Sequence, residues 1–305
     1  MAIEESLSRA KVEKEAVDEV YMGNVLPGSM GQAPDRQAAL FAGLSKSVPC
    51  TMINKVCASG MKAIMIGASN VASGRSKVVV AGGFESMSNV PYYMSRGDTP
   101  YGGVKLVDGL VFDGLTDVYN KFHMGNCGEN TAAKLGITRA QQDEYGMQSY
   151  KRSAKAYEEG KIQPELFEVK VEQKRGKPPL VVSEDEEFRK INFDKFTKLP
   201  TVFQKENGTV TAGNASTLSD GAAACVLMAA DEAKARGLKA VAKVVDFADG
   251  ATDPIDFPIA PQIANDRLLK LVGMTAQDVD LWEINEAFSV VVLANMKLHN
   301  LDPGN

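Results

Sequence analysis

The sequence is poor in residues that titrate near neutral pH or bind zinc. Among its 305 residues there are only two histidines, His123 and His299, so a histidine base has only two candidates. The four cysteines form no C-x-x-C pair: Cys50, Cys57, Cys127 and Cys225. In a chain of this length, that scarcity argues against a disulfide framework or a zinc site and favours a reducing compartment.

Long apolar runs and a basic surplus are also missing. No segment approaches the roughly 18 consecutive apolar residues of a membrane-spanning helix, so no membrane association is expected. The N-terminus, MAIEESLSRAKVEKE, lacks the apolar core of a signal peptide and is too acidic for a good transit peptide, which leaves a cytoplasmic location open. The net charge of -5 argues against nucleic acid as a partner, because phosphate binding needs clustered lysine and arginine.

What the sequence does contain is an alternation of apolar runs and helical patterns, which predicts an α/β fold. Residues 78–83 (VVVAGG) and 221–230 (GAAACVLMAA) are continuously apolar, as strands buried on both faces are. A nearly all-apolar helix is expected between Cys57 and Lys77. Five of its side chains are expected to point inward: Met61, Ile64, Met65, Ala68 and Val71.

The middle of the chain is less regular. Thr138 and Gln141 form a capping-box pattern that opens a long helix to about Ile162. Residues 84–130 are rich in glycine, proline, tyrosine and methionine, and residues 163–215 carry a hairpin pattern and a polar loop. A loop-rich insertion of this length in an α/β scaffold is typical of a binding lid.

A short internal echo indicates duplication. Val17–Val25 and Asp278–Phe288 each follow an acidic helix and each read acid, aliphatic, aromatic, two residues, asparagine. We interpret them as parts of two copies of one α/β unit, with LWEI (281–284) as the strand of the second copy. Because the sequence ends soon after Asn285, the second copy is expected to be incomplete.

Cys57 is the leading candidate for a nucleophile. It precedes the expected helix, where unpaired backbone N–H groups and the positive end of the helix dipole favour thiolate over thiol. The small residues Ala58, Ser59 and Gly60 leave room for a substrate to approach the backbone. The alternative is that Cys57 is a small buried hydrophobic residue, as most free cysteines are.

Other positions admit both a functional and a structural interpretation. Asn285 could orient a water or polarise a carbonyl oxygen, or it could cap the last helix. Asn214 to Ser216 could contact a ligand or form a tight turn. His123 could be a base, a ligand contact or a core histidine, whereas His299 is expected at the surface.

Six segments of the chain resemble the thiolase family: NKVCASGMKAI (54–64), AGGFESMSNVPY (81–92), YGGVKLVDGL (101–110), GLTDVYNKFHMG (114–125), TVFQKENGTVTAGNAST (201–217) and WEINEAFSVVVLAN (282–295). The resemblance is strongest to mitochondrial thiolases that act on acetoacetyl-CoA. It implies two α/β halves stacked as α-β-α-β-α layers, with a loop domain that holds coenzyme A. We therefore expect three segments: an N-terminal half at 1–83, a loop domain and lid at 84–215, and the last strand of that half with an incomplete second half at 216–305.

The resemblance also implies a role for each matching residue. Cys57 would carry the acetyl group as a thioester in the formation or cleavage of acetoacetyl-CoA, and Asn285 would hold the catalytic water of the oxyanion hole. Six residues would contact coenzyme A: His123, Met124, Tyr150, Lys190, Lys195 and Ser216. A potassium ion would be bound by Tyr150 and by the backbone of Ala212, Gly213 and Ala215. Lys190 stands where the family has an arginine. This replacement loses the planar guanidinium group, which stacks and binds phosphate through two N–H donors.

The substrates implied are acetyl-CoA and acetoacetyl-CoA. The resemblance implies no tightly bound cofactor, and potassium is the candidate ion. The resemblance implies a mitochondrial location and a homo-oligomer, or a hetero-oligomer with a full-length thiolase. The family's first strand, its G-H-P histidine, which deprotonates the nucleophile, and its C-x-G-G-G cysteine do not occur in the sequence. We therefore keep two functions open: a thiolase, or a catalytically impaired paralogue that binds coenzyme A or pairs with a complete thiolase.

Overall fold

The computed structural model describes residues 1–174 and 176–302 and divides into two compact units. The first unit combines Met1–Leu115 with Leu218–Val244, and the second combines Thr116–Thr217 with Val245–Asn305. This grouping differs from the three expected segments, whose boundaries stay a prediction. Arg175, in the expected hairpin loop, and the last three residues of the chain lie outside the described residues.

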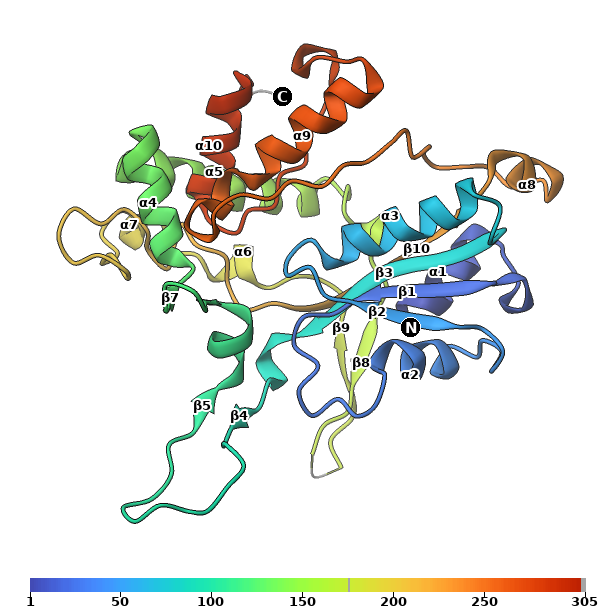
Figure 1. The fold of residues 1–305 in the computed structure, drawn as a ribbon, viewed down its shortest axis with the longest axis horizontal. Coiled ribbons are helices and arrows are strands. Elements are labelled where there is room, and N and C mark those ends of the chain that lie inside the picture. Colours follow the sequence, from blue (N-terminus) through green and yellow to red (C-terminus); the bar gives the residue numbers. More distant parts are fainter. Residues whose placement is uncertain (175, 303–305) are drawn as a thin grey trace. The chain divides into compact units, whose positions relative to one another are not determined.

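A four-stranded mixed sheet organises the first unit (Figure 1). In spatial order its strands are β10 (Asp220–Met228), β3 (Val78–Ser86), β1 (Glu19–Gly23) and β2 (Cys50–Ile53). β1 runs parallel to β2 and β3, whereas β10 runs antiparallel to β3. Parallel strands connected through helices are what the alternating sequence pattern predicts, so the α/β class is confirmed.

Helices cover both faces of this sheet (Figure 1). The helices of the unit are α1 (Ala2–Ala10), α2 (Pro34–Phe41), α3 (Ser59–Ala72) and α8 (Ala230–Ala235), with 3-10 turns at Lys14–Ala16 and Met87–Asn89. Val20 and Val80 pack in the cluster with α1 and α2, while Tyr21 and Val79 pack with α3. Successive strand residues point to opposite faces, so the apolar run of β3 is buried on both sides, as predicted.

Two details of burial were predicted wrongly. Met61, expected to point inward, is 67% exposed, because α3 packs on the sheet with one side only. The strand at 221–230 is not buried on both faces. The first residues of β10, Asp220–Ala223, are exposed, since β10 forms an edge of the sheet and has β3 as its one partner among the described strands.

Gly82 of β3 has the backbone of β10 where a side chain would be. A carbon added at Gly82 would lie 2.1 Å from the Ala223 carbonyl oxygen. We expect Gly82→Ala to lower the free energy of unfolding by about 2 to 3 kcal/mol in urea titrations, because the ladder must distort. The control is Gly221→Ala in β10, where no atom lies within 4 Å of the added carbon. Equal unfolding midpoints for the two variants would contradict this prediction.

The first unit also carries an arm beyond β3. β4 (Tyr92–Tyr93) and β5 (Val107–Asp108) pair antiparallel, and a π-helical turn follows at Leu110–Gly114. Figure 1 shows the loop between β4 and β5 as a long excursion from this hairpin. The irregular composition of residues 84–130 therefore corresponds to short elements separated by loops.

The second unit is mostly helical. Its helices are α4 (Gly125–Leu135), α5 (Arg139–Glu158), α6 (Glu187–Lys190), α7 (Phe193–Phe196), α9 (Ala260–Val272) and α10 (Ser289–His299), with 3-10 turns at Gln163–Glu165, Pro254–Ile259 and Ala276–Asp278. Its strands are β6 (Thr116–Asp117), β7 (Phe122–His123), β8 (Val169–Val171) and β9 (Leu180–Val182), which form two hairpins. The hairpin predicted within 163–215 is thus confirmed.

The predicted capping box opens α5. The Thr138 hydroxyl accepts a hydrogen bond from the Gln141 N–H at 3.3 Å, and the Gln141 carbonyl oxygen Oε1 accepts one from the Thr138 N–H at 2.8 Å. The helix ends at Glu158, a turn before the predicted Ile162. A core of Val290, Val291 and other apolar residues holds α10 against α4.

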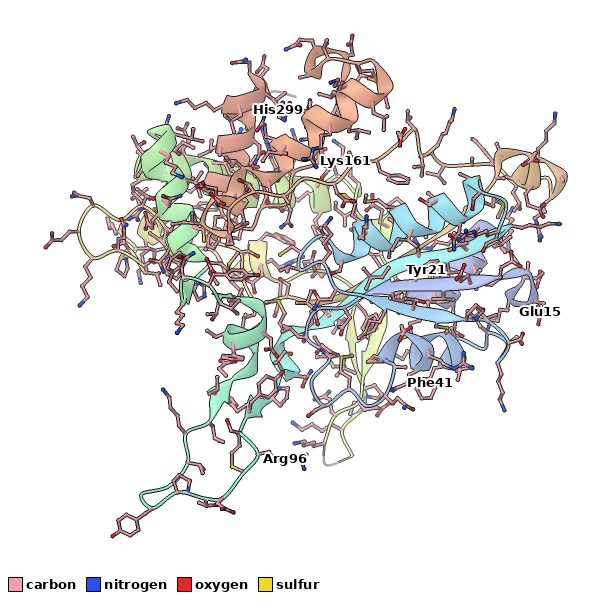
Figure 2. The ribbon with its side chains drawn as sticks, in the orientation of Figure 1. Glu15, Tyr21, Phe41, Arg96, Lys161 and His299 are labelled. Carbon is pink, nitrogen blue, oxygen red and sulfur yellow. The ribbon has the colours of Figure 1, made fainter. Side chains whose placement is uncertain are left out.

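Three local predictions in the second unit are wrong. Residues 281–284 form no strand, because neither ladder of this unit's described residues pairs with them, and a strand needs a partner. Asn285 does not cap a helix, since α10 begins at Ser289 after Phe288. His299 (Figure 2) is 7% exposed rather than on the surface, and its ring packs 5.2 Å from that of Trp282.

Among the described residues, no helix has the length and apolarity needed to cross a bilayer.

Candidate active site

Cys57 lies in a tight loop directly before α3. The Ser59 hydroxyl accepts a hydrogen bond from the Lys55 N–H at 2.8 Å and donates one to the Val56 carbonyl oxygen at 2.5 Å. The Asn54 side chain accepts the Val56 N–H at 3.0 Å. These contacts hold Val56 at a φ of 49°, a left-handed conformation that is strained for a β-branched residue. Such strain is concentrated at functional sites, so this loop is a candidate site by its own geometry.

The environment of Cys57 decides two questions from the sequence: whether the residue is buried, and whether its thiol pKa is lowered. The residue is exposed, so the alternative of a buried hydrophobic cysteine is wrong. However, burial of the sulfur among neighbouring atoms outweighs its backbone hydrogen bond and raises the pKa of Cys57 above the ordinary value. α3 begins at Ser59, two residues further on, where the dipole effect on the sulfur is weaker. The thiol therefore needs a base to react at neutral pH.

Alkylation should rank the four thiols by access. Cys57 is exposed, Cys50 and Cys225 are partly buried, and Cys127 is buried, with a pKa raised to about 11 by burial. We expect iodoacetamide to label Cys57 at least about tenfold faster than Cys127, because alkylation needs an accessible thiolate. Peptide mass spectrometry after partial labelling measures the ranking. Equal labelling of all four thiols would contradict it.

His123 is held in a defined tautomer at the end of β7. Its Nδ1 accepts a hydrogen bond from the Gly125 N–H at 3.1 Å, so the proton of the neutral ring is on Nε2. The ring stacks on Phe203 with centroids 4.7 Å apart, and burial lowers the pKa of His123. At neutral pH this side chain is therefore a neutral donor through Nε2. The neighbouring Met124 is partly buried.

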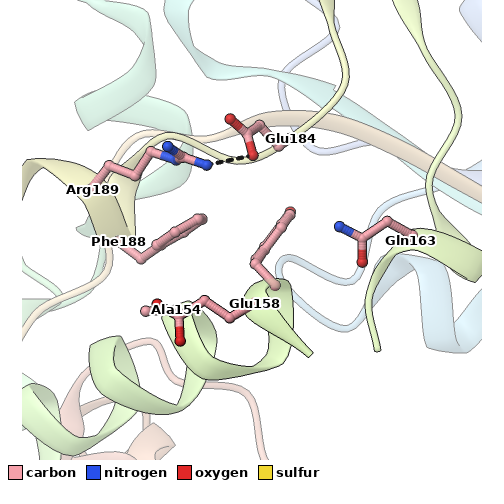
Figure 3. A pocket seen from close by; sticks show the side chains of 7 residues that line it. Ala154, Glu158, Gln163, Glu184, Phe188 and Arg189 are labelled. Atoms are coloured by element: carbon pink, nitrogen blue, oxygen red, sulfur yellow. Dashed lines mark hydrogen bonds and ion pairs between the residues drawn. The ribbon is translucent and has the colours of Figure 1, made fainter. Parts of the chain in front are cut away.

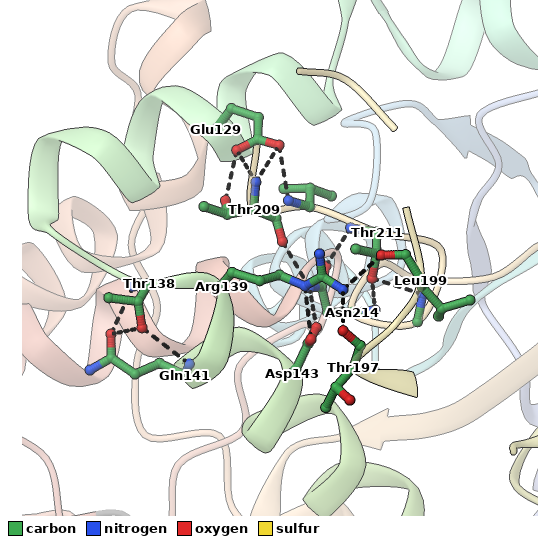
Figure 4. Close-up of polar contacts among 12 residues, drawn as sticks. Glu129, Thr138, Arg139, Gln141, Asp143, Thr197, Leu199, Thr209, Thr211 and Asn214 are labelled. Atoms are coloured by element: carbon green, nitrogen blue, oxygen red, sulfur yellow. Dashed lines mark hydrogen bonds and ion pairs between the residues drawn. The ribbon is translucent and has the colours of Figure 1, made fainter. Parts of the chain in front are cut away.

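A buried polar network fixes the turn at 211–215 (Figure 4). Asn214 is 2% exposed and donates from Nδ2 to Asp143 at 2.9 Å and to the Thr209 carbonyl oxygen at 3.0 Å. Its Oδ1 accepts the Thr211 N–H at 2.9 Å. Asp143 in turn accepts from Arg139 at 2.8 Å, one turn earlier on α5. The structure thus supports the tight-turn interpretation for Asn214 itself, whereas Ser216 is exposed beyond the turn.

Gly146 of α5 allows this turn to approach the helix closely. A carbon added there would lie 3.0 Å from the Phe196 ring and 3.5 Å from the Gly213 carbonyl oxygen. The turn is also tied to the segment before α10. The Ser216 N–H donates to the Ala287 carbonyl oxygen at 3.0 Å, and the Ser289 N–H to that of Asn214 at 2.8 Å. Residues 211–216 and 287–289 are therefore positioned together.

Five of the residues predicted to bind coenzyme A or potassium line one cavity of about 280 Å³: Tyr150, Lys190, Lys195, Ala212 and Gly213. Lys190 already pairs with Glu186 at 2.8 Å and Glu187 at 3.3 Å, and these carboxylates raise the pKa of Lys190. The ammonium of Lys195 forms no ion pair within the described residues, so it is the freer cation of the two.

Asn285 lies in the irregular segment before α10 with its side chain exposed. Its amide forms no hydrogen bond in the part of the chain that the structure describes. The next residue, Glu286, is held by two hydroxyl groups of α5: Tyr145 donates to it at 2.7 Å and Ser149 at 2.9 Å. Sequence reasoning missed Glu286, Tyr145 and Ser149. The i,i+4 spacing of the two hydroxyls was visible, but their distant partner was not.

A larger cavity of about 570 Å³ lies elsewhere in the second unit (Figure 3). Its wall includes the stacked rings of Tyr157 and Phe188, 4.7 Å apart, and the ion pair between Arg189 and Glu184 at 2.8 Å. None of the predicted site residues lines it. Across residues 1–174 and 176–302, no cluster of three histidine, cysteine or acidic side chains could hold a metal ion.

The predicted site residues thus fall into two groups. Tyr150, Lys190 and Lys195 share a cavity with the 211–215 turn, and hydrogen bonds link Ser216 to the segment that follows Asn285. Cys57 belongs to the other compact unit, and its loop is defined independently of them.

Comparison with known proteins agrees with this architecture. The chain matches the family model "Thiolase, N-terminal domain" over residues 1–231 and "Thiolase, C-terminal domain" over residues 238–305. It is 60% identical to the mitochondrial acetyl-CoA acetyltransferase of Bos taurus over 99% of this chain and 72% of the bovine protein. For the Homo sapiens protein of the same description, identity is 60% over 99% of this chain and 71% of that protein.

A solved structure, the Acat5 thiolase from Ascaris suum in complex with coenzyme A, matches with a TM-score of 0.94 at 42% identity and covers 98% of this chain and 77% of that one. The helix-covered mixed sheet and these relatives define the class as an α/β acyltransferase. Within that class, the chain belongs to the thiolase family.

Proposed function

We propose that this protein is an acetyl-CoA acetyltransferase that forms and cleaves acetoacetyl-CoA through a thioester on Cys57. The similarity to mitochondrial acetyl-CoA acetyltransferases, 60% identity over 99% of the chain, carries this proposal. Cys57 is an exposed residue in a loop with a strained neighbour, Val56, which supports its assignment as the nucleophile. The comparisons with relatives do not favour the alternative of a catalytically impaired paralogue.

In the cleavage direction, Sγ of Cys57 attacks the keto carbon of acetoacetyl-CoA. The bond from that carbon to the adjacent CH2 breaks, and the CH2 carbon takes the electron pair and one proton, which releases acetyl-CoA. The thiol of a second coenzyme A then attacks the acetyl thioester on Cys57 and leaves with the acetyl group. The proton of the coenzyme A thiol is transferred to Sγ of Cys57 and restores its thiol. Because the pKa of Cys57 is raised, the first step depends on general base catalysis.

Asn285 is our candidate for the group that stabilises the oxyanion through a bound water. Its exposed amide has no hydrogen-bond partner among the described residues, so both polar ends of the side chain are available. A donor aimed at the developing negative charge is typically worth about 10²- to 10³-fold in kcat.

For coenzyme A binding, we assign the phosphates to Lys195 and the remaining contacts to five further residues: His123, Met124, Tyr150, Lys190 and Ser216. Lys195 lines the 280 Å³ cavity and forms no ion pair with any residue that the structure describes, whereas Lys190 must exchange its two carboxylate partners before it binds phosphate. The Nε2–H of neutral His123 is suited to donate to an amide or thioester oxygen of the pantetheine arm. The coenzyme A complex of the Ascaris suum relative supports this ligand class.

A potassium ion fits the same cavity. Tyr150, Ala212 and Gly213 line it, and the carbonyl oxygens of Ala212, Gly213 and Ala215 accept no hydrogen bond within the described residues. Neutral oxygen donors of this kind suit a hard cation. The ion would supply a positive charge near the phosphates, and the Tyr150 hydroxyl would complete its shell.

The test is turnover of acetoacetyl-CoA by the purified protein with coenzyme A, followed by the loss of the acetoacetyl-CoA enolate absorbance. We expect two acetyl-CoA molecules per substrate, and mass spectrometry should find one acetyl group on Cys57 when coenzyme A is omitted. A protein that neither cleaves acetoacetyl-CoA nor becomes acetylated at Cys57 would overturn the proposal.

We further propose a mitochondrial location, as in the named relatives, and assembly into homo-oligomers or with a complete thiolase.

A further inference from the structure

The segment that carries Asn285 has no regular secondary structure of its own. Residues 281–286 are neither helix nor strand, and Asn285 is exposed. A catalytic amide in such a segment needs an external support, because a misplacement of about 1 Å can cost about 10²-fold in rate. The contacts of the neighbouring residues identify that support.

Glu286 is fixed by two donors from a rigid helix. Tyr145 and Ser149 are one turn apart on α5, so their side chains lie on the same face of that helix. Tyr145 donates to one carboxylate oxygen of Glu286 at 2.7 Å, and Ser149 donates to the other at 2.9 Å. Hydrogen bonds to an ionised acceptor are stronger than those between neutral groups.

On the other side of Glu286, Ala287 is also tied down. Its carbonyl oxygen accepts the Ser216 N–H at 3.0 Å, next to the buried turn at 211–215. The two attachments follow Asn285 by one and two residues. They therefore restrain the backbone from which its amide extends.

We propose that Glu286, held by hydrogen bonds from Tyr145 and Ser149, is a positioning residue that orients Asn285 for catalysis. This inference rests on the proposed function for its effect on catalysis. Glu286 holds the backbone from which Asn285 extends, without contact to the substrate. Burial, followed by the hydrogen bond to Glu286 and its negative charge, raises the pKa of Tyr145, so the phenol stays protonated and donates at neutral pH.

The key variant removes both donors but leaves Glu286 intact: Tyr145→Phe combined with Ser149→Ala. We expect hydrogen exchange at the amides of Ser216 and Ser289, whose N–H groups donate the hydrogen bonds that attach this segment to the turn, to rise by about tenfold. We expect kcat for acetoacetyl-CoA cleavage to fall by about 10- to 100-fold, with KM changed less than about twofold. Glu286→Ala should raise the exchange rate and lower kcat to the same extent. Glu286→Gln should recover kcat to within about threefold, because an amide can accept from Tyr145 and donate to Ser149.

The matched control is Tyr157→Phe, which removes another tyrosine–carboxylate hydrogen bond of the same helix, to Asp185 at 3.0 Å. It should leave both kcat and the exchange of the Ser216 and Ser289 amides unchanged. Wild-type exchange rates in the double variant would overturn the proposal. A second result would also overturn it: a Glu286→Gln variant as slow in kcat as Glu286→Ala, with exchange at Ser216 and Ser289 still at the wild-type rate. Glu286 would then act through its charge and not by positioning.

These readouts separate the two proposals. A wild-type protein without acetoacetyl-CoA turnover would count against the proposed function, while the exchange data would still decide whether Glu286 orders the segment. Active enzyme with unaltered kcat in the double variant would leave the function intact and overturn the positioning role.

Discussion

Cys57→Ala is expected to abolish acetyl transfer. Because we propose that the acetyl group is bonded to Sγ of Cys57 in both half-reactions, no other group can take over without rebuilding the site. Loss of a nucleophile typically lowers kcat by about 10⁴-fold or more. Acetoacetyl-CoA cleavage measures the loss, and mass spectrometry of the quenched enzyme should find no acetylated peptide at residues 54–64.

The matched control for this variant is Cys50→Ser. Cys50 is a partly buried thiol in β2 of the same compact unit, and its Sγ donates to the Val48 carbonyl oxygen at 3.6 Å, a contact that a hydroxyl can keep. We expect wild-type turnover from it. Residual activity of Cys57→Ala above about one per cent of wild type would contradict a covalent role for Cys57.

Asp143→Ala is expected to have the largest effect on stability in the second unit. The carboxylate is 3% exposed and accepts from Arg139 at 2.8 Å and from Asn214 at 2.9 Å. Its removal leaves a guanidinium and a buried amide each without one partner. The expected loss is about 3 kcal/mol in the free energy of unfolding, measured by urea titration, because breaking a buried ion pair costs more than losing an exposed one.

The same change should weaken substrate binding, since Asn214 fixes the turn whose backbone lines the cavity with Tyr150 and Lys195. We expect a higher KM for acetoacetyl-CoA and an intermediate phenotype for Asp143→Asn, which keeps one acceptor. The control is Glu159→Ala at the end of α5. Glu159 forms exposed ion pairs with Lys155 and Lys161 and should leave the unfolding midpoint unchanged. Equal midpoints for Asp143→Ala and Glu159→Ala would contradict the assignment.

Local features of the fold were predictable because their causes are local. The strand at Val78–Ser86 follows from a run of β-branched residues, and the start of α5 follows from Thr138 and Gln141 three residues apart. The segment at 281–284 has the same apolar character as a strand. It forms none, because a strand also needs a neighbour to pair with, and that depends on the path of the whole chain.

The candidate site divides in the same way. The resemblance in sequence motifs identified the family and selected Cys57 and Asn285 as candidates. It also assigned Tyr150, Lys190 and Lys195 to the same ligand, and in the structure these three residues line one cavity. It did not determine the state of those groups. The pKa of Cys57 is raised rather than lowered because the sulfur is desolvated, and desolvation depends on atoms from other segments.

The sequence by itself determined the family, the α/β class and the identity of the candidate nucleophile, because these depend on residue types and short spacings. Only the tertiary structure decided how the site is supported. The partners that fix it are 71 residues apart for Asp143 and Asn214, and 141 apart for Tyr145 and Glu286. No periodicity links positions so distant. Their hydrogen bonds exist because packing of α5 against the turn at 211–215 and the segment before α10 brings them within reach.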